Sequence, residues 1–126
     1  IAFKRKSFFK KNIWFNVLFG AGSIYGAGEE TLVIREAVRK GLKIYEYPAN
    51  IAEVDYSTST WFKGYNHEYF YNKGAFLEAC YSKLKFILKY YYVLKFKKIT
   101  KLSYKEILKL IEDGAKGYKN FKKYGD

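Results

Sequence analysis

The chain has 126 residues, enough for one modest domain, and 49% of them are hydrophobic, a content too high for a disordered chain. Lys and Arg number 24 against 12 Asp and Glu, so the formal charge is +12 and anionic partners are expected: lipid, nucleic acid or phosphate-bearing ligands. The one cysteine, Cys80, excludes an internal disulfide, and its apolar neighbours predict a buried thiol rather than a nucleophile.

Three short stretches of the N-terminal half have the composition of strands: 1–3, 42–48 and 50–56. Pro48 is expected to end the second of them. The chain begins at Ile1 and contains no methionine, so we expect it to be a piece of a longer protein. No signal peptide is visible, because the basic start has no apolar run after it.

A helix is predicted between these strands, at 29–41. Its acids fall in the first turn and its basic residues in later turns, which suits the helix dipole. Gly41 supplies the stop signal. Apolar residues at helical spacing define the face that should be buried: Val33, Ile34, Ala37 and Val38.

The C-terminal half is predicted to be helical. A second helix begins after Ser103, an N-cap that completes a capping box with Glu106, and Gly114 or Gly117 is expected to end it. Before it, apolar residues recur at steps of three and four from His67 to about Lys98 and predict one long helix: Leu77, Cys80, Leu84, Ile87, Tyr91 and Leu94.

The stretch "FGAGSIYGAGEE" at 19–30 places four glycines before two glutamates. It is not a dinucleotide fingerprint, because Tyr25 stands where a glycine is required, and it lacks the Gly-Lys-Ser/Thr of a phosphate loop. Glycines before a helix let the backbone approach a ligand closely and place first-turn side chains beside it. Glu29 and Glu30 are therefore candidate site residues, although composition alone favours an ordinary turn and helix start.

The run "FNVLFGAGSIYGAGEETLVIREAVRKGLKIYEYP" and the later "STWFKGYNHEYFYNKGA" together resemble family 2 glycosyltransferases. The resemblance covers roughly residues 1–80. It implies an α/β fold class: the C-terminal portion of a glycosyltransferase A (nucleotide-diphospho-sugar transferase) fold, followed by C-terminal helices. Residues 1–66 would be the acceptor-side half of the catalytic domain, and 67–126 the basic, aromatic helices.

The resemblance also implies roles for the acidic pair. These inverting enzymes transfer a sugar from a nucleotide-sugar donor, and a carboxylate takes the proton from the acceptor hydroxyl. The family's usual pair is Glu-Asp, with the second acid as the base, so Glu30 is the expected base and Glu29 the supporting acid. Because this chain has Glu in both places, either could be the base.

The acceptor side is expected to be formed by glycine-rich and aromatic loops. Aromatic rings can stack on a sugar face, and Trp61 could serve in this way or could instead fix its loop to the core. The resemblance places this loop over the acceptor and slightly favours binding. The expected substrate-binding residues are Gly26, Gly28, Trp61, Gly64 and Tyr65.

The donor-binding half of such an enzyme is not recognisable in this chain. The three aspartates, Asp55, Asp113 and Asp126, form no Asp-x-Asp motif, and Asp55 is at best a minor contributor. The divalent metal of the full-length enzyme, Mg or Mn, would be liganded mainly outside this chain. His67 is the only histidine, so no zinc site is expected, and His67 reads as a surface or helix-start residue. We expect these residues alone to bind nucleotide sugars weakly and to be inactive.

The positive charge is concentrated late: from Lys83 onward there are 13 lysines and four acids. The most apolar stretch, 84–96, is interrupted by lysines and is not expected to span a bilayer. We expect the basic helices to attach to an anionic membrane surface at the cytoplasmic face, where lipid-linked or saccharide acceptors of cell-surface polysaccharide assembly are used. The alternatives are a non-catalytic membrane or nucleic-acid module, or a solvated face of packed helices.

Overall fold

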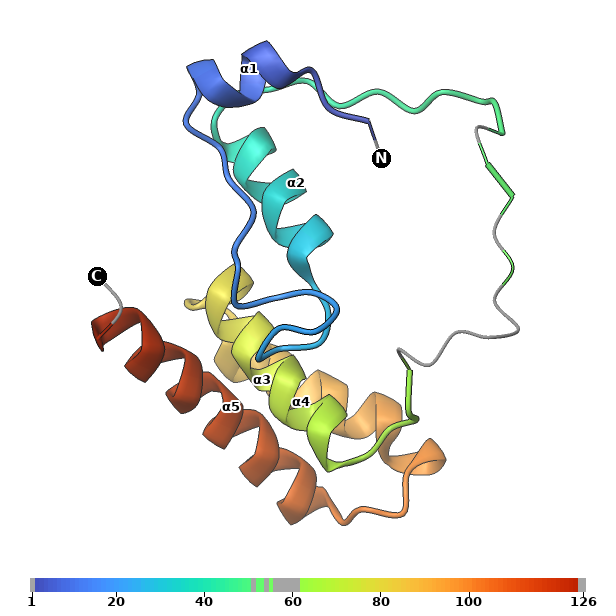
Figure 1. The fold of residues 1–126 in the computed structure, drawn as a ribbon. Helices are drawn as coiled ribbons and strands as arrows, with labels where there is room; N and C mark the ends of the chain where they lie inside the picture. The colour runs from blue at the N-terminus through green and yellow to red at the C-terminus, as the bar shows by residue number, and fades with distance from the viewer. Residues whose placement is uncertain (1, 51, 54, 56–61, 125–126) are drawn as a thin grey trace.

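The computed structural model describes residues 2–50, 52–53, 55 and 62–124. The helices are α1 (Arg5–Lys10), α2 (Glu29–Arg39), α3 (His67–Tyr81), α4 (Lys85–Phe96), the 3-10 helix η1 (Lys97–Ile99) and α5 (Tyr104–Tyr124). Figure 1 shows the last three α-helices lying together, with α1 at the opposite end of the molecule and α2 between α1 and α3.

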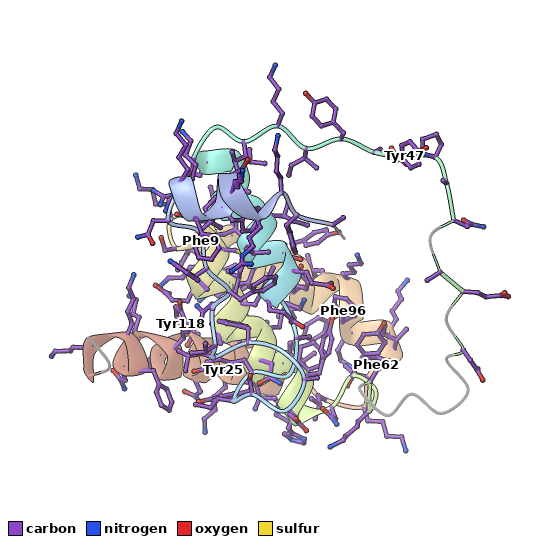
Figure 2. All side chains as sticks on the ribbon, turned by 45° about the horizontal axis from the view of Figure 1, so that its top comes forward. Phe9, Tyr25, Tyr47, Phe62, Phe96 and Tyr118 are labelled. Atoms are coloured by element: carbon purple, nitrogen blue, oxygen red, sulfur yellow. The ribbon has the colours of Figure 1, made fainter. Side chains whose placement is uncertain are left out.

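The α/β fold expectation is wrong. No β-sheet occurs among the described residues, which show only an isolated bridge between Phe19 and Tyr25. The segment 42–48, expected as a strand, runs away from the helices, and Figure 2 shows Tyr47 on it. An extended segment is stabilised by hydrogen bonds to a neighbouring strand, and 42–48 has no such neighbour in the described part.

The other two expected strands, 1–3 and 50–56, are also not strands at the positions that the structure describes. Residues 2 and 3 are not in a strand, and neither are residues 50, 52, 53 and 55. The remaining positions of 1–3 and 50–56 lie outside the described residues. The glycosyltransferase A fold is therefore not the architecture of the described chain, which is built from helices.

Helix α2 confirms the helix predicted at the acidic pair. It begins at Glu29, and Gly41 follows its end with φ +78°, a left-handed conformation that favours glycine. The buried face is narrower than predicted, because only Val33 and Ala37 are fully buried while Val38 is 56% exposed. Val33 and Ala37 form a small core with Ile13 from the segment after α1.

The single long helix expected from His67 to Lys98 is wrong. The chain leaves α3 after Tyr81, turns at 82–84, and starts α4 at Lys85. Leu84, Ile87 and Leu94 continue the apolar spacing of α3 in the sequence, but the turn places them on the outside of the molecule, where all three are exposed. Periodicity alone could not reveal this break, because the turn contains no Gly or Pro.

Helix α5 begins as predicted and ends later. The Ser103 backbone N–H donates to Glu106 at 2.7 Å, and the Glu106 N–H donates to the Ser103 hydroxyl at 3.3 Å, so the capping box is confirmed. The helix then continues through Gly114 and Gly117 to Tyr124. Neither glycine is a stop signal.

The two interior glycines Gly74 and Gly114 bring α3 and α5 into backbone contact. A Cβ atom on Gly74 would lie 2.9 Å from the Cα of Ile111 and nearer still to its carbonyl group. A Cβ on Gly114 would lie 2.8 Å from the carbonyl carbon of Tyr71. Only glycine allows helices to cross this closely, so Gly114 is in α5 for packing.

The main core lies where α3, α4 and α5 meet. Its buried residues come from all three helices: Phe70, Leu77, Val93, Phe96, Ile107 and Ile111. Glu78 is buried beside this core and is ion-paired with Lys85 of α4 and, at 3.7 Å, with Lys119 of α5. Buried carboxylates require such partners, so Glu78 links the three helices electrostatically.

Candidate functional site

The glycine stretch forms a closed loop on the surface of α3 and α5. The Tyr25 N–H donates to the Leu18 carbonyl and the Gly20 N–H donates to the Tyr25 carbonyl, both at 2.9 Å. Gly20 and Gly22 adopt φ values of +121° and +80°. These are left-handed conformations that favour glycine, so the loop requires the residues that the sequence supplies.

Tyr25 anchors this loop in the molecule. Its side chain is fully buried, and its ring centroid lies 5.0 Å from that of Phe19 and 6.0 Å from that of Tyr118 on α5 (Figure 2). Burial raises the pKa of the Tyr25 hydroxyl to about 12. A second attachment joins the start of the loop to α5, because the Asn16 amide donates to the Tyr118 hydroxyl at 3.1 Å.

Gly28 ends the loop at the N-terminus of α2, and no other residue fits there. Its φ is +117°, and a Cβ would lie 2.7 Å from Cδ2 of Phe76 on α3. The close approach sets the start of α2 directly against α3. The first turn of α2, which carries Glu29, Glu30 and Thr31, therefore has a fixed position next to the loop.

A cavity of about 800 Å³ lies between the glycine loop, the segment 62–66 and α3. Gly26, Gly28 and Thr31 form one side, and Phe62, Gly64 and Asn66 are on the other. Helix α3 contributes five lining side chains: Glu68, Tyr69, Asn72, Lys73 and Phe76. The site thus combines glycine backbone, aromatic rings, two amides and two charge types.

The predicted substrate-binding glycines meet in this cavity. Gly26, Gly28 and Gly64 all line it, although nearly forty residues separate the first from the last. Tyr65 instead packs edge-on against Tyr69, at 5.0 Å between ring centroids, and lies 4.9 Å from Phe96. Trp61 lies outside the described residues.

The acidic pair lies beside the cavity. The Glu29 carboxylate lies close to Gly20, since a Cβ on that glycine would be 3.3 Å from Cδ of Glu29. Glu30 is exposed and stands in the chain between the lining residues Gly28 and Thr31. Among the described residues that line the cavity, the one with a carboxylate side chain is Glu68 rather than Glu29 or Glu30. The roles assigned to Glu29 and Glu30 remain predictions.

Asn66 and Glu68, which both line the cavity, stand at the start of helix α3. The Asn66 side chain accepts a hydrogen bond from the Tyr69 N–H at 2.9 Å and so caps the helix. Glu68 follows in the first turn, where a carboxylate interacts favourably with the helix dipole. The signal "NHE" was present in the sequence, but it gave no indication that this turn would lie opposite the glycine loop.

Lys73 is the second charged group that sequence reasoning missed. Its Nζ lies between 5.1 and 5.4 Å from the ring centroids of Tyr69, Phe76 and Tyr92. This arrangement is a cation–π cage built from two helices. Burial lowers the pKa of the Lys73 ammonium from its ordinary value, and the positive charge of Lys95 acts in the same direction.

The described residues do not fit a metal site. None of their His, Cys, Asp and Glu side chains forms a group of three that could hold an ion. Among the described lining residues of the cavity, the one carboxylate, that of Glu68, shares the space with the Lys73 ammonium, which repels a cation. The divalent ion expected of the full-length enzyme would be liganded outside these residues. His67 is the exposed first residue of α3, as expected, and Cys80 is buried, where desolvation raises the pKa of its thiol.

No protein-family model, curated protein or solved structure matches this chain. Function must therefore be inferred from the cavity and from the surface of the helices.

Proposed function

We propose that the cavity binds a saccharide, and that this chain is the acceptor side of an inverting glycosyltransferase. Such an enzyme moves a sugar from a nucleotide-sugar donor to a hydroxyl of a saccharide or lipid-linked acceptor, here in bacterial cell-surface polysaccharide assembly. One observation carries the proposal: the glycine loop and the segment 62–66, two stretches assigned to acceptor binding from sequence, line the same cavity. The proposal concerns the site and its chemistry and does not require the fold that the resemblance implied.

The lining of the cavity has the chemistry that sugars require. A pyranose presents C–H bonds on its faces, which pack on aromatic rings, and hydroxyls at its edge, which hydrogen-bond to amides and carboxylates. Phe62, Tyr69 and Phe76 supply rings, while Asn72 and Glu68 supply polar groups. The glycines leave backbone groups uncovered by side chains, so a ligand can approach them closely.

The first turn of α2 supplies the proposed base. Glu30 is exposed and stands in the chain between the lining residues Gly28 and Thr31, and its carboxylate would accept the proton of an acceptor hydroxyl as that oxygen attacks the anomeric carbon. Glu29 is the supporting acid. The bond to the nucleoside diphosphate breaks as the new glycosidic bond forms, and the diphosphate leaves with its electron pair.

We further place the protein at the inner, cytoplasmic face of the cell membrane as a peripheral protein. None of the helices in the described part is long and apolar enough to cross a bilayer. The excess of lysine after residue 82 supports attachment to anionic lipid, because each basic group near such a surface contributes to binding.

Saccharide binding can be tested on the chain as it stands by titration in ¹⁵N-resolved NMR. Mono- and oligosaccharides should shift the amide signals of Gly26, Gly28 and Gly64, whereas uridine and guanosine diphosphate sugars should bind weakly or not at all. The matched control is Gly41, which follows α2 and does not line the cavity. If free saccharides leave the three cavity glycines unshifted, the cavity is not an acceptor site.

The role of Glu30 requires a transferase assay on a protein that contains this chain and a nucleotide-binding half. Glu30→Gln should lower turnover by about 10²–10⁴-fold, because the amide cannot take the proton. Glu29→Gln should be milder. Melting temperatures measured alongside the rates separate lost chemistry from lost folding. If both variants turn over normally, the acidic pair is only the start of a helix.

A further inference from the structure

Helix α4 is apolar on two opposite sides. Its inner side contributes Val93 and Phe96 to the core. Its outer side carries an exposed stripe at steps of three and four residues, which we call the outer α4 face: Leu84 (54% exposed), Ile87 (68%), Tyr91 (53%) and Leu94 (69%). Phe86 and Tyr90, also exposed, widen it. A helix that is apolar all round is normally covered on both sides.

The charge around this face has one sign. Between Glu78 and Glu106 the sequence holds eight lysines and no acid. Lys85 and Lys89 pair with Glu78 and Glu112 of the neighbouring helices, on the inner side of α4. The exposed lysines at the two ends of the outer face, Lys83 and Lys98, form no ion pair within the described part of the chain.

We propose that the outer α4 face docks on an anionic lipid surface. Leu84, Ile87 and Leu94 would enter the boundary between headgroups and acyl chains, as the apolar face of an interfacial helix does. Tyr91 suits the same depth, because its ring is apolar and its hydroxyl is polar. Lys83 and Lys98 would contact lipid phosphates. The inference rests on the peripheral location proposed above, but it does not depend on the transfer reaction.

The pattern favours lipid over two other occupants. A second copy of the chain paired through this same face would bring the lysines of both copies together without acids between them, which is unfavourable. Nucleic acid would engage the lysines and the aromatic rings, but it has no use for exposed Leu and Ile side chains. A bilayer surface accommodates both the aliphatic stripe and the lysines.

The test is vesicle flotation of the full 126-residue chain with phosphatidylcholine vesicles, either alone or mixed with phosphatidylserine. The chain should bind the mixed vesicles, bind neutral ones much less, and lose affinity as salt is raised. The variant Ile87→Gln/Leu94→Gln should reduce the partition coefficient about tenfold, because two aliphatic side chains no longer favour insertion. Both positions are exposed, so the fold should be retained.

Two further variants complete the design. Val38→Gln makes a similar change at a 56% exposed position on α2 and should leave binding unchanged. Lys83→Gln should weaken binding to the mixed vesicles about fivefold and leave the neutral vesicles unaffected. Circular dichroism melts of every variant establish that the fold is intact.

The proposal is overturned if Ile87→Gln/Leu94→Gln floats as wild type does, or if the wild type binds neither kind of vesicle. It is also overturned if the wild type is a dimer in sedimentation and the variant is a monomer, or if the wild type binds oligonucleotides and the variant does not. If the glycine amide signals respond to saccharide but the chain binds no vesicles, the membrane proposal fails and the transferase proposal stands. If the chain binds vesicles but the glycine signals do not respond to saccharide, the membrane proposal stands and the saccharide site is refuted.

Discussion

Replacement of Gly114 by alanine should separate α5 from α3. A Cβ at this position would lie 2.8 Å from the Tyr71 carbonyl carbon and 3.2 Å from the Ala75 nitrogen, whereas ordinary contact begins at 3.4 Å. Backbone atoms cannot rotate away, so the helices must move apart by more than about half an ångström and loosen the core between them. Alanine favours the helix by about 1 kcal/mol over glycine, but overpacking of this kind costs about 3 kcal/mol or more. We expect a net loss of about 2 kcal/mol in the free energy of unfolding.

Gly117→Ala is the matched control for this effect. It lies one turn later on α5, where a Cβ would meet the hydroxyl end of the Tyr71 side chain, which can rotate away. Its unfolding free energy should stay within about 1 kcal/mol of wild type, because the gain in helix propensity offsets the adjustment of Tyr71. Urea unfolding followed by far-ultraviolet circular dichroism measures both. Equal stability of Gly114→Ala and wild type would show that α3 and α5 do not touch at these glycines.

Two further outcomes follow from single side chains. Tyr25→Phe should raise the melting temperature or leave it unchanged, because the buried Tyr25 hydroxyl has no hydrogen-bond partner among the described residues and removing it spares its desolvation; a marked drop in the melting temperature would contradict this. The Arg39 guanidinium holds the pKa of Glu36 at about 2, below its ordinary 4.5, through two hydrogen bonds of 2.8 Å. A depressed pKa stabilises the fold above pH 4.5, and this contribution is lost as the pH falls towards 2. Glu36→Gln should therefore reduce the fall in unfolding free energy between pH 4.5 and pH 2 by less than about 1 kcal/mol. An unchanged fall in unfolding free energy over this range would refute the prediction.

Local signals in the sequence were sufficient to predict both ends of α2 and the start of α5. The acidic pair and Gly41 bound α2, and the hydrogen bonds between Ser103 and Glu106 start α5 where the capping box predicts. Such signals work because the groups that satisfy a helix end lie within four residues of it.

Local sequence signals could not predict two features: the break between α3 and α4, and the absence of a sheet from the described residues. Both depend on what packs against a segment rather than on the segment itself. An apolar stripe that looked like one continuous core face is divided, and four of its six residues, including Ile87 and Leu94, face outward.

The candidate site was predictable only in part. Gly26 and Gly28 were identified because glycine runs have a physical reason near a ligand, and Gly64 because the resemblance placed its loop over the acceptor; all three do line one cavity. Glu68 and Lys73 were missed, because helix spacing shows which residues share a face but not which face will meet the loop. The Lys73 cage includes Tyr92 from another helix, a contact that no local pattern encodes.

The hydrogen bond between Asn16 and Tyr118 joins residues 102 positions apart, and its consequence concerns the order of assembly during synthesis. The glycine loop leaves the ribosome well before α5, which supplies the Tyr118 ring and hydroxyl that hold it. Until Tyr118 emerges, Asn16 lacks its partner and Tyr25 lacks one wall of its pocket. The loop can therefore settle only after the 102 residues that follow Asn16 have been translated, which gives chaperones a long interval to act on it.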